Sequence, residues 1–467
     1  MRELLAAGEV AVIGLARSGL AAARLAAREG ARVYASDSGP RPSNSVATGR
    51  GAAAAPDALA VLGITEQYGG HDLERIAKAS LAIVSPGVPP DAAPVVAARG
   101  AGIPVVSEVE LALWFLGKAR LIAVTGTNGK STVTALIAHL LRSLGADATA
   151  AGNIGVALSE IALMPVPPVW IALEMSSFQL HDTSSLRPAV GVLTNLSPDH
   201  LDRYAGTDDY YADKDRLFVN ADAASIWVTN ADDVEVTRRA ARVRGEHRRF
   251  SVRGLGVDAT FDEAHEAITL LGERLMPRAD IPLFGQHNVA NVLAATLAVA
   301  SADPAFTTGS ARDGLARGLR SFEGLPNRLE VVADSEGVLW INDSKATNVA
   351  SARVAIDAMT RPTVILMGGK HKGESYTSLA ASLANRARLV IVFGEAAAQI
   401  EADLAASGTH VPLERLGSSF EEVIARARTA AARGDAVLLS PACSSFDMFR
   451  NYEDRGDIFR RLARGVA

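Results

Sequence analysis

Residues 124–133, VTGTNGKSTV, combine the residue types of a phosphate-binding loop. In the common pattern G-x-x-x-x-G-K-[ST], backbone N–H groups hold the phosphates of a nucleotide and the lysine reaches the terminal phosphate. Here only two residues separate Gly126 from Gly129, and Lys130 and Ser131 then follow as the pattern requires. The residues therefore predict nucleotide binding by a shortened loop.

Polar side chains follow two apolar segments further along the chain. Glu174 ends the segment WIALE, and Asn195, Asp199 and His200 follow AVGVL. Because the carboxyl ends of parallel strands meet at one edge of a sheet, we expect these groups beside the phosphate-binding loop. A carboxylate, an imidazole and the hydroxyl of Ser131 could share one Mg²⁺. The pattern predicts a magnesium site next to the loop.

The elements that position these groups alternate between strand and helix. An apolar strand at 121–124 leads into the loop, and STVTALIAHLLRSLG has the apolar period of a helix that stops at Gly145. The same alternation recurs later, as in VLWINDSKATNVASARVAIDAM and ARLVIVFGEAAAQIEADLAASG. An α/β fold is therefore expected throughout the chain.

The first part of the chain has the outline of a mononucleotide-binding unit. EVAVIGLARSGLAAARLAAREGARVYASD predicts a strand, a glycine turn, an alanine-rich helix and a second strand that ends in Asp37. Gly14 and Gly19 match the G-x-G-x-x-G fingerprint, but Ala16 stands at the middle glycine, where a methyl group would crowd a pyrophosphate. A ligand-binding turn and a plain strand-to-helix turn both remain open.

Composition limits the class of protein. A chain of 467 residues is too long for one core, and divisions near 117/118 and 324/325 give three parts. Lys and Arg total 47 against 52 Asp and Glu, so the net charge of −5 offers no basic surface for nucleic acid. The single cysteine, Cys443, excludes a disulfide framework and fits a reducing compartment. Without a secretory signal or a membrane-spanning apolar stretch, a cytoplasmic protein is expected.

A series of motifs resembles the muramyl ligases of peptidoglycan synthesis. The motifs are GTNGKST, GNIG at 152–155, EMSSFQL, SPDHLDRY, FGQHN at 284–288, LPNRLE, NDSKATN at 342–348 and LLSPACSSFDMFRNYEDRG. The resemblance runs from about residue 10 to residue 460, and only the loop at 41–60 is uninformative. Within the family it is greatest to the members that add D-glutamate.

The resemblance implies a fold and a reaction. It implies a Rossmann-like domain over 1–117 for the UDP-sugar, a central P-loop ATPase-like domain with a mainly parallel sheet over 118–324, and a Rossmann-like domain over 325–467 for the amino acid. It implies the substrates ATP, UDP-N-acetylmuramoyl-L-alanine and D-glutamate, with Mg²⁺ as cofactor. ATP would convert a substrate carboxylate into an acyl phosphate, and the amine of D-glutamate would displace the phosphate. No enzyme nucleophile is needed, so catalysis would depend on positioning and charge neutralisation. A monomer that binds neither nucleic acid nor membranes is expected.

The same resemblance implies roles for single residues. Lys130 would hold the β and γ phosphates, Ser131 and Glu174 would bind one Mg²⁺, and His200 would help to hold a second. Lys214 stands where the family carbamylates a lysine with CO₂, and the carbamate would support the metal site. Further ATP contacts are expected from Gly126, Thr127, Asn128, Gly129, Thr132, Asn288, Asn291, Arg328, Asp343 and Lys345. Substrate contacts are expected from Gly14, Ser18, Asp37, Ser38, Gly87, Asn153, Thr347, Lys372, Ser445 and Tyr452.

Other interpretations fit parts of the sequence. A dinucleotide-dependent oxidoreductase would use the first part, but Ala16 weakens its fingerprint and the phosphate loop would have no role. A GTPase-like switch would need N-K-x-D, and the nearest match, TNADD from Thr229, lacks the lysine. Folylpolyglutamate synthases share the shortened loop but carry it near the N-terminus. Without the resemblance, Lys214 in DDYYADKDRLF would be expected on a solvated helix face. Gly39 replaces an arginine of some muramyl ligases, which leaves the uracil contacts open.

Overall fold

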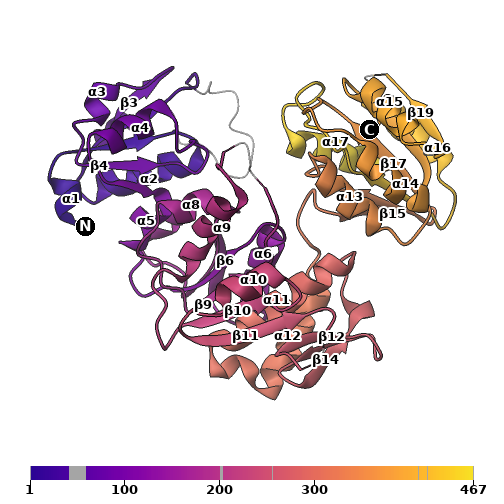
Figure 1. Ribbon diagram of the computed structural model, residues 1–467, viewed down its shortest axis with the longest axis horizontal. Helices are drawn as coiled ribbons and strands as arrows, with labels where there is room; N and C mark the ends of the chain where they lie inside the picture. Colours follow the sequence, from indigo (N-terminus) through magenta and orange to yellow (C-terminus); the bar gives the residue numbers. More distant parts are fainter. Residues whose placement is uncertain are drawn as a thin grey trace. The chain divides into compact units, whose positions relative to one another are not determined.

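The computed structural model describes residues 2–41, 59–199, 203–254, 256–408, 410–417 and 419–465. Over these residues the chain forms three α/β domains, each built on its own sheet (Figure 1). Internal contacts divide the chain into two compact units, Met1–Asp280 with Ala290–Arg320 and Ile281–Val289 with Ser321–Ala467. The predicted α/β fold with mainly parallel sheets is confirmed. The domain boundaries at 117/118 and 324/325 stay predictions.

The first unit begins with a parallel sheet of order β3-β2-β1-β4-β5, which is the order of a Rossmann-like domain. Its strands are β1 (Glu9–Ile13), β2 (Arg32–Asp37), β3 (Thr65–Tyr68), β4 (Leu81–Val84) and β5 (Val105–Ser107). Its helical segments are α1 (Arg2–Ala6), α2 (Arg17–Arg28), η3 (Ala60–Leu62), α3 (Leu73–Ile76), α4 (Ala93–Gly100) and α5 (Glu108–Leu113). A Cβ on Gly19 would lie 1.8 Å from the carbonyl oxygen of Gly14, so this glycine lets α2 pack closely on the turn after β1.

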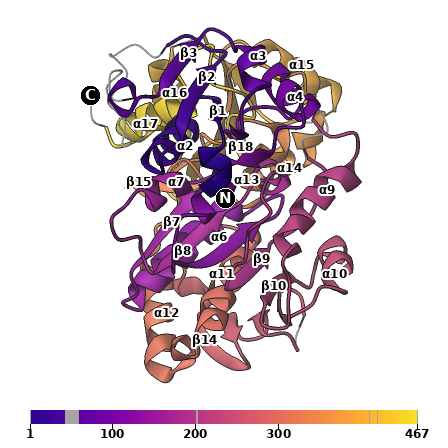
Figure 2. The same cartoon turned by 90° about the vertical axis from the view of Figure 1, so that its left-hand side faces the viewer.

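The central sheet has the order β14-β13-β12-β11-β10-β9-β6-β8-β7, with antiparallel pairing at β12–β13 and β13–β14 and parallel pairing at the other junctions of the described strands. Its strands are β6 (Arg120–Thr125), β7 (Ala148–Gly152), β8 (Trp170–Glu174), β9 (Val190–Leu193), β10 (Ile226–Asn230), β11 (Glu246–Ser251), β12 (Ala259–Asp262), β13 (Ala267–Leu270) and β14 (Glu273–Pro277). Its helical segments are α6 (Lys130–Ser143), α7 (Leu158–Ala162), α8 (Ser177–His181), α9 (Thr207–Asp215), η4 (Arg216–Phe218), α10 (Val234–Ala240), η5 (Arg278–Asp280), α11 (Gln286–Ala302), η6 (Pro304–Thr307) and α12 (Gly309–Ser321). Helix α6 packs against β7 and β8 (Figure 2).

One apolar core joins the N-terminal and central domains inside the first unit. It contains Leu25 of α2, Leu111 of α5 and Ile161 of α7. On α5, Glu110 accepts hydrogen bonds from the backbone N–H groups of Ser184 and Ser185, at 2.8 Å each. Apolar packing and a satisfied carboxylate therefore both hold these two domains together.

A second carboxylate of α5 makes stability depend on pH. Glu108 is 1% exposed, its Oε1 accepts from Ser159 N at 2.6 Å, and burial raises its pKa from 4.5 to about 7. The folded protein therefore keeps a proton that the unfolded chain releases, so the free energy of unfolding falls as pH rises from about 4.5 to about 7 and stays low above it. Glu108→Gln removes this titration and should raise stability at pH 8 by up to about 3 kcal/mol, with no gain at pH 4.5. Urea unfolding at several pH values tests this, with exposed Glu263→Gln as the control. An equal effect of Glu108→Gln at both pH values would contradict it.

The second unit contains the C-terminal sheet, of order β15-β16-β20-β17-β18-β19, in which β15 runs antiparallel to β16 and the other described pairs are parallel. Its strands are β15 (Glu330–Ser335), β16 (Val338–Asn342), β17 (Thr363–Gly368), β18 (Ala387–Phe393), β19 (Leu413–Arg415) and β20 (Ala436–Leu439). Its helical segments are α13 (Val349–Asp357), η7 (Thr377–Leu379), α14 (Ala380–Arg386), α15 (Ala397–Ala406), α16 (Phe420–Ala430) and α17 (Tyr452–Ala463). Successive residues of β17 face opposite cores: Ile365 packs with α13, α14 and α15, and Leu366 packs with α16 and α17.

None of the helices formed by the described residues has both the length and the apolar character that a membrane crossing requires.

Candidate active site

Two glycines shape the shortened loop between β6 and α6. Gly126 has φ 144°, and a Cβ there would lie 2.0 Å from the hydroxyl oxygen of Thr194. Gly129 has φ 82°, and a Cβ there would lie 2.3 Å from Oδ1 of Asn291. Any larger residue would be strained at both places. The loop thus turns sharply into the N-terminus of α6, where helix geometry favours an anion.

The segment after β9 supports the loop. Asn195 accepts from Thr127 N through its carbonyl oxygen at 2.8 Å and from Asn128 N through Oδ1 at 2.8 Å. Its own amide donates to Asn128 O at 3.0 Å, and Thr194 Oγ1 donates to the same oxygen at 2.7 Å. The expected proximity of this strand end to the loop is therefore observed, and Asn195 serves to hold the loop.

Two lysines converge on one carbonyl oxygen of the loop. Lys130 Nζ donates to Gly126 O at 3.0 Å and to Thr127 O at 2.7 Å, while Lys214 Nζ donates to Gly126 O at 2.8 Å. Lys214 is 1% exposed, so its place is buried beside the loop rather than on a solvated helix face. Burial and then the positive charge of Lys130 lower the pKa of Lys214 to about 6. At neutral pH the Lys214 side chain is mostly an uncharged, nucleophilic amine.

Glu174 brings a carboxylate to the same edge of the sheet. It ends β8, opposite Val124 of β6, and it is 2% exposed. Asn153 Nδ2 donates to its Oε1 at 3.0 Å, whereas its buried Oε2 has no hydrogen-bond partner among the described residues. An unpaired buried carboxylate oxygen is costly, and a cation would satisfy it.

This carboxylate fits a magnesium site. The oxygen of Glu174 and the hydroxyl of Ser131 are hard donors of the kind that Mg²⁺ takes, usually together with water and phosphate oxygens. The described residues contain no group of three or more His, Cys, Asp or Glu side chains that could hold a metal by themselves. Of the other two residues predicted to support the metal, Lys214 lies beside the loop, and His200 lies outside the described residues.

The predicted sugar-nucleotide residues lie at the carboxyl edge of the N-terminal sheet. Asp37, at the end of β2, accepts from Leu15 N at 2.6 Å through Oδ2 and from Gly39 N at 2.7 Å through Oδ1. Its carboxylate thus ties the turn after β1 to the turn after β2. The other predicted residues follow strand ends or begin α2: Gly14, Ser18, Ser38 and Gly87.

In the second unit, predicted nucleotide and amino-acid residues meet at a strand end. Asp343 follows β16, and its carboxylate accepts from Leu329 N at 3.2 Å and Ser440 Oγ at 3.3 Å. Burial raises the pKa of Asp343 to about 7. Lys345 Nζ lies 2.9 Å from the hydroxyl of Tyr452 and 4.3 Å from its ring centroid.

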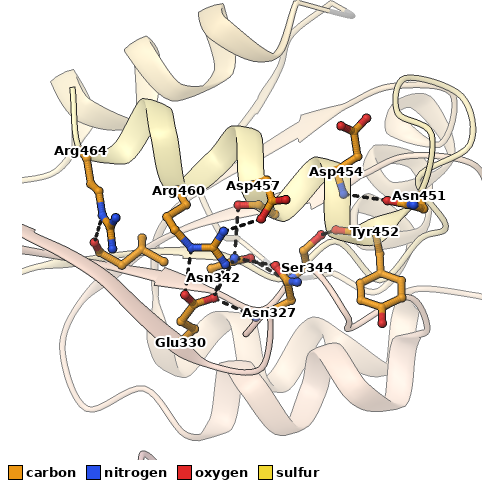
Figure 3. A network of polar contacts seen from close by, with 12 residues as sticks. Asn327, Glu330, Asn342, Ser344, Asn451, Tyr452, Asp454, Asp457, Arg460 and Arg464 are labelled. Carbon is orange, nitrogen blue, oxygen red and sulfur yellow. Dashed lines mark hydrogen bonds and ion pairs between the residues drawn. The ribbon is translucent and has the colours of Figure 1, made fainter. Parts of the chain in front are cut away.

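Helix α17 is anchored beside these residues by a polar network (Figure 3). Arg460 donates to both oxygens of Glu330, at 2.9 and 2.8 Å, and Asn342 Nδ2 donates to Asn327 Oδ1 at 2.8 Å. At the N-terminus of the helix, Ser344 Oγ donates to the carbonyl oxygen of Tyr452 at 2.8 Å. The network fixes the neighbours of Arg328, Asp343 and Lys345.

A buried arginine that no sequence pattern marks connects the end of β17 with the loops that follow β16 and β20. Arg455 is fully buried and donates to Ser344 O at 2.8 Å, to Cys443 O at 3.3 Å and to Gly368 O at 3.5 Å. Lys370 N donates to Ser444 O at 2.9 Å and Ser444 N donates back at 3.1 Å, which pairs the loop of Lys372 with the loop of Ser445.

The single cysteine has a structural environment. Cys443 is buried, its sulfur lies 3.0 Å from the hydroxyl of Tyr376, and burial raises its pKa to about 11. A thiol held neutral in this way is a poor nucleophile, so Cys443 has a packing role rather than a catalytic one.

Comparison with known proteins identifies the family. Three family models match in order: "Mur ligase MurD-like, N-terminal domain" over residues 8–107, "Mur ligase middle domain" over 124–299, and "Mur ligase, glutamate ligase domain" over 327–443. The chain belongs to the Mur ligase family. The resemblance seen in its motifs is thereby confirmed.

Curated Mur ligases match along almost the full chain. The UDP-N-acetylmuramoylalanine–D-glutamate ligase of Salinibacter ruber is 40% identical over 464 residues, which cover 97% of this chain and 96% of the relative. The ligase of the same name from Anaeromyxobacter dehalogenans is 40% identical over 469 residues and 97% of each chain.

Solved Mur ligase structures share the fold. The UDP-N-acetylmuramate-alanine ligase MurC of Thermotoga maritima matches with a TM-score of 0.61 at 19% identity, over 98% of this chain and all of the other. A pseudomurein peptide ligase type C of Methanothermus fervidus matches with a TM-score of 0.58 at 18% identity, over 98% of this chain and all of the other.

Proposed function

We propose that this chain is an ATP-dependent amide ligase that joins D-glutamate to UDP-N-acetylmuramoyl-L-alanine, giving ADP and phosphate, in peptidoglycan precursor synthesis. The observation that carries the proposal is that Lys130 and the buried Lys214 meet at one loop carbonyl in a Mur ligase, beside a Glu174 oxygen that has no hydrogen-bond partner among the described residues. The names of the relatives at 40% identity support D-glutamate as the amino acid. A cytoplasmic location and a monomeric state stay predictions.

The first unit would position ATP for transfer of its terminal phosphoryl group. The N–H groups at the start of α6 and the ammonium of Lys130 would bind the phosphates, and Thr127, Asn128, Thr132 and Asn291 line or follow the loop. Glu174 and Ser131 would hold Mg²⁺, which supplies charge neutralisation on the phosphates when bound. Asn153, bonded to Glu174, would contact the sugar-nucleotide substrate near the carboxylate that is activated.

Lys214 would act as its carbamate. Its uncharged nitrogen forms a bond to the carbon of CO₂, one C=O pair moves to oxygen, and a proton leaves the nitrogen for solvent. The product carries a negative charge where the amine carried none. A negative carbamate would balance the positive charges of Lys130 and of a metal bound at Glu174. An ammonium at Lys214 would instead be repelled by the ammonium of Lys130.

The second unit would supply the remaining ATP contacts and the amino-acid site. Asn288, Arg328, Asp343 and Lys345 are the proposed ATP residues of this unit. D-Glutamate carries two carboxylates and needs cationic and hydroxyl donors, which Lys372, Ser445 and Thr347 provide. Tyr452 would form a wall of the pocket while its hydroxyl orients Lys345.

Phosphate release measured with substrates omitted in turn tests the function. We expect turnover only when ATP, UDP-N-acetylmuramoyl-L-alanine and D-glutamate are all present. A panel with L-alanine, lysine and diaminopimelate in place of D-glutamate should remain at background. Turnover without the nucleotide sugar, or a preference for another amino acid, would refute the proposed reaction.

Substitution of Lys372 tests the amino-acid site. Lys372→Ala should raise the KM for D-glutamate roughly 10- to 150-fold, because one charge-assisted hydrogen bond of about 1.5–3 kcal/mol is lost. The KM for ATP should change much less. Lys370→Ala, which removes an equal charge from the same exposed loop, is the matched control. Equal changes of KM in the two variants would mean that only loop charge matters.

A further inference from the structure

Asp213, the residue before Lys214, is held from two sides. It lies in the last turn of α9 and is 9% exposed. Its Oδ1 accepts from Nδ1 of His181 at 2.8 Å, and its Oδ2 accepts from the hydroxyl of Tyr204 at 2.9 Å. Because a carboxylate only accepts, Nδ1 of His181 carries the proton in this contact. The hydrogen bond to Asp213 also raises the pKa of His181, which strengthens the pair as a charge-assisted contact.

The residues after Lys214 are tied to the same place. Arg216 Nε donates to Leu180 O at 2.7 Å, and Arg216 Nη2 donates to Thr183 O at 3.2 Å. His181 is the last residue of α8, so contacts on both sides of Lys214 reach the C-terminal end of one short helix.

Helix α8 is in turn fixed to the strand that carries Glu174. Only Met175 separates Glu174 from Ser176, the N-cap of α8. Ser176 Oγ accepts from Gln179 N at 3.2 Å, and Ser176 N donates to Gln179 Oε1 at 3.0 Å, which makes a complete capping box. A rigid connection therefore runs from Glu174 through α8 to the backbone on either side of Lys214.

We propose that His181 and Asp213 are positioning residues, which hold the end of α9 so that the Lys214 nitrogen stays at the Gly126 carbonyl, where its carbamate forms. This inference rests on the proposed carbamate and concerns the same site. The side chain of Lys214 is a flexible stem of four methylene groups. Its nitrogen stays at the Gly126 carbonyl only if the backbone of Lys214 is held at the right distance from the loop. His181 and Tyr204, which both donate a hydrogen bond to Asp213, are called the bracket. Without the bracket the end of α9 gains conformational freedom, and the entropy cost of placing the Lys214 amine rises.

The environment of His181 lets the contact be removed without burying a lone charge. A cavity of about 210 Å³ borders His181, and Gln179, Arg203, Tyr204 and Asp213 also line it. The His181 side chain is 45% exposed. In a His181→Ala variant, water from this cavity can reach Asp213, and Tyr204 continues to donate to it. The variant is therefore expected to fold.

Carbamate occupancy measured on the full chain tests the bracket. The protein is equilibrated with ¹³C-bicarbonate over a range of concentrations, the carbamate carbon is followed by NMR, and the bicarbonate dependence of phosphate release is measured in parallel. His181→Ala should raise the bicarbonate concentration for half occupancy about tenfold or more, the effect of losing one charge-assisted hydrogen bond. At saturating bicarbonate its KM values for ATP and D-glutamate should equal those of the unmodified protein.

His181→Asn should restore occupancy, because its amide nitrogen can donate from nearly the position of Nδ1. His265→Ala is the matched control, since it removes another His–Asp contact, of 2.7 Å to Asp262, from an exposed turn. Tyr204→Phe gives a second test that keeps the ring stacked on Phe178 and removes only the hydroxyl. It should also raise the half-occupancy concentration.

The outcomes separate the two proposals. Unchanged bicarbonate dependence in both His181→Ala and Tyr204→Phe, with a carbamate present in the parent protein, would overturn the bracket alone. A parent protein that releases phosphate with the expected substrates but shows no carbamate signal would overturn the carbamate and the bracket together, and leave the ligase reaction standing.

Discussion

Lys214→Ala should lower the rate of phosphate release by about a hundredfold, the upper end of the range for removing a group that orders a metal site. The physical reason is charge. Lys130 and a metal bound at Glu174 bring positive charge to a buried place, and the carbamate of Lys214 is the proposed negative group that balances it. An alanine supplies neither the anion nor the contact with Gly126 O. The Gly126 carbonyl still accepts from Lys130, so the loop should keep its shape.

Chemical rescue distinguishes this role from loss of packing. Acetate or formate is a small anion that fits the space left by the lysine side chain, and either should restore part of the activity of Lys214→Ala. Lys118→Ala, at an exposed position ahead of β6, is the control for removal of a lysine from the same unit. Activity equal to that of the parent protein in Lys214→Ala would remove Lys214 from the mechanism.

Much of the central site could be predicted because its signals are local. The apolar strand at 121–124 and the helix stopping at Gly145 correspond to β6 (Arg120–Thr125) and α6 (Lys130–Ser143). Glycines mark the sharp turn between them, and parallel pairing carries the strand-end Glu174 to the same edge. The apolar period, the turn residues and the alternation of strand and helix are each visible in a short window of sequence.

The burial of Lys214 could not be read in the same way. Helix α9 has the sequence TDDYYADKD, in which charged residues dominate and no apolar stripe marks a buried face. Its burial arises from tertiary contacts to the loop at Gly126 and to His181, residues far away in the sequence. Only the family resemblance singled out this lysine, and pattern analysis alone assigned it to solvent.

The contacts of Arg455 and His181 could not be predicted from the sequence, for a related reason. Arg455 lies in a helix with many charged residues, and its buried guanidinium bonds backbone carbonyls of three segments that are distant from one another in the sequence. His181 ends a five-residue helix and has no neighbour in sequence that reveals Asp213 as its partner. Polar contacts between distant segments leave no periodic signal, so sequence patterns identify the strand ends of a site more readily than the side chains that hold them.

Lys130→Ala should also lower the rate of phosphate release, but for the opposite electrostatic reason to Lys214→Ala. The variant lacks a cation where negative charge spreads over the transferring phosphoryl group, and loss of such a contact typically lowers the rate by about 10² to 10⁴. Lys130 also donates to Gly126 O and Thr127 O, so Lys130→Arg is needed as a control that keeps a positive charge at the loop. A carboxylate should give no rescue, whereas a small amine such as ethylamine, protonated at neutral pH, should restore part of the activity. The two variants thus form a crossed test, with anions expected to rescue Lys214→Ala and cations Lys130→Ala. Rescue of both variants by the same ion would show that the charges at this site have been assigned wrongly.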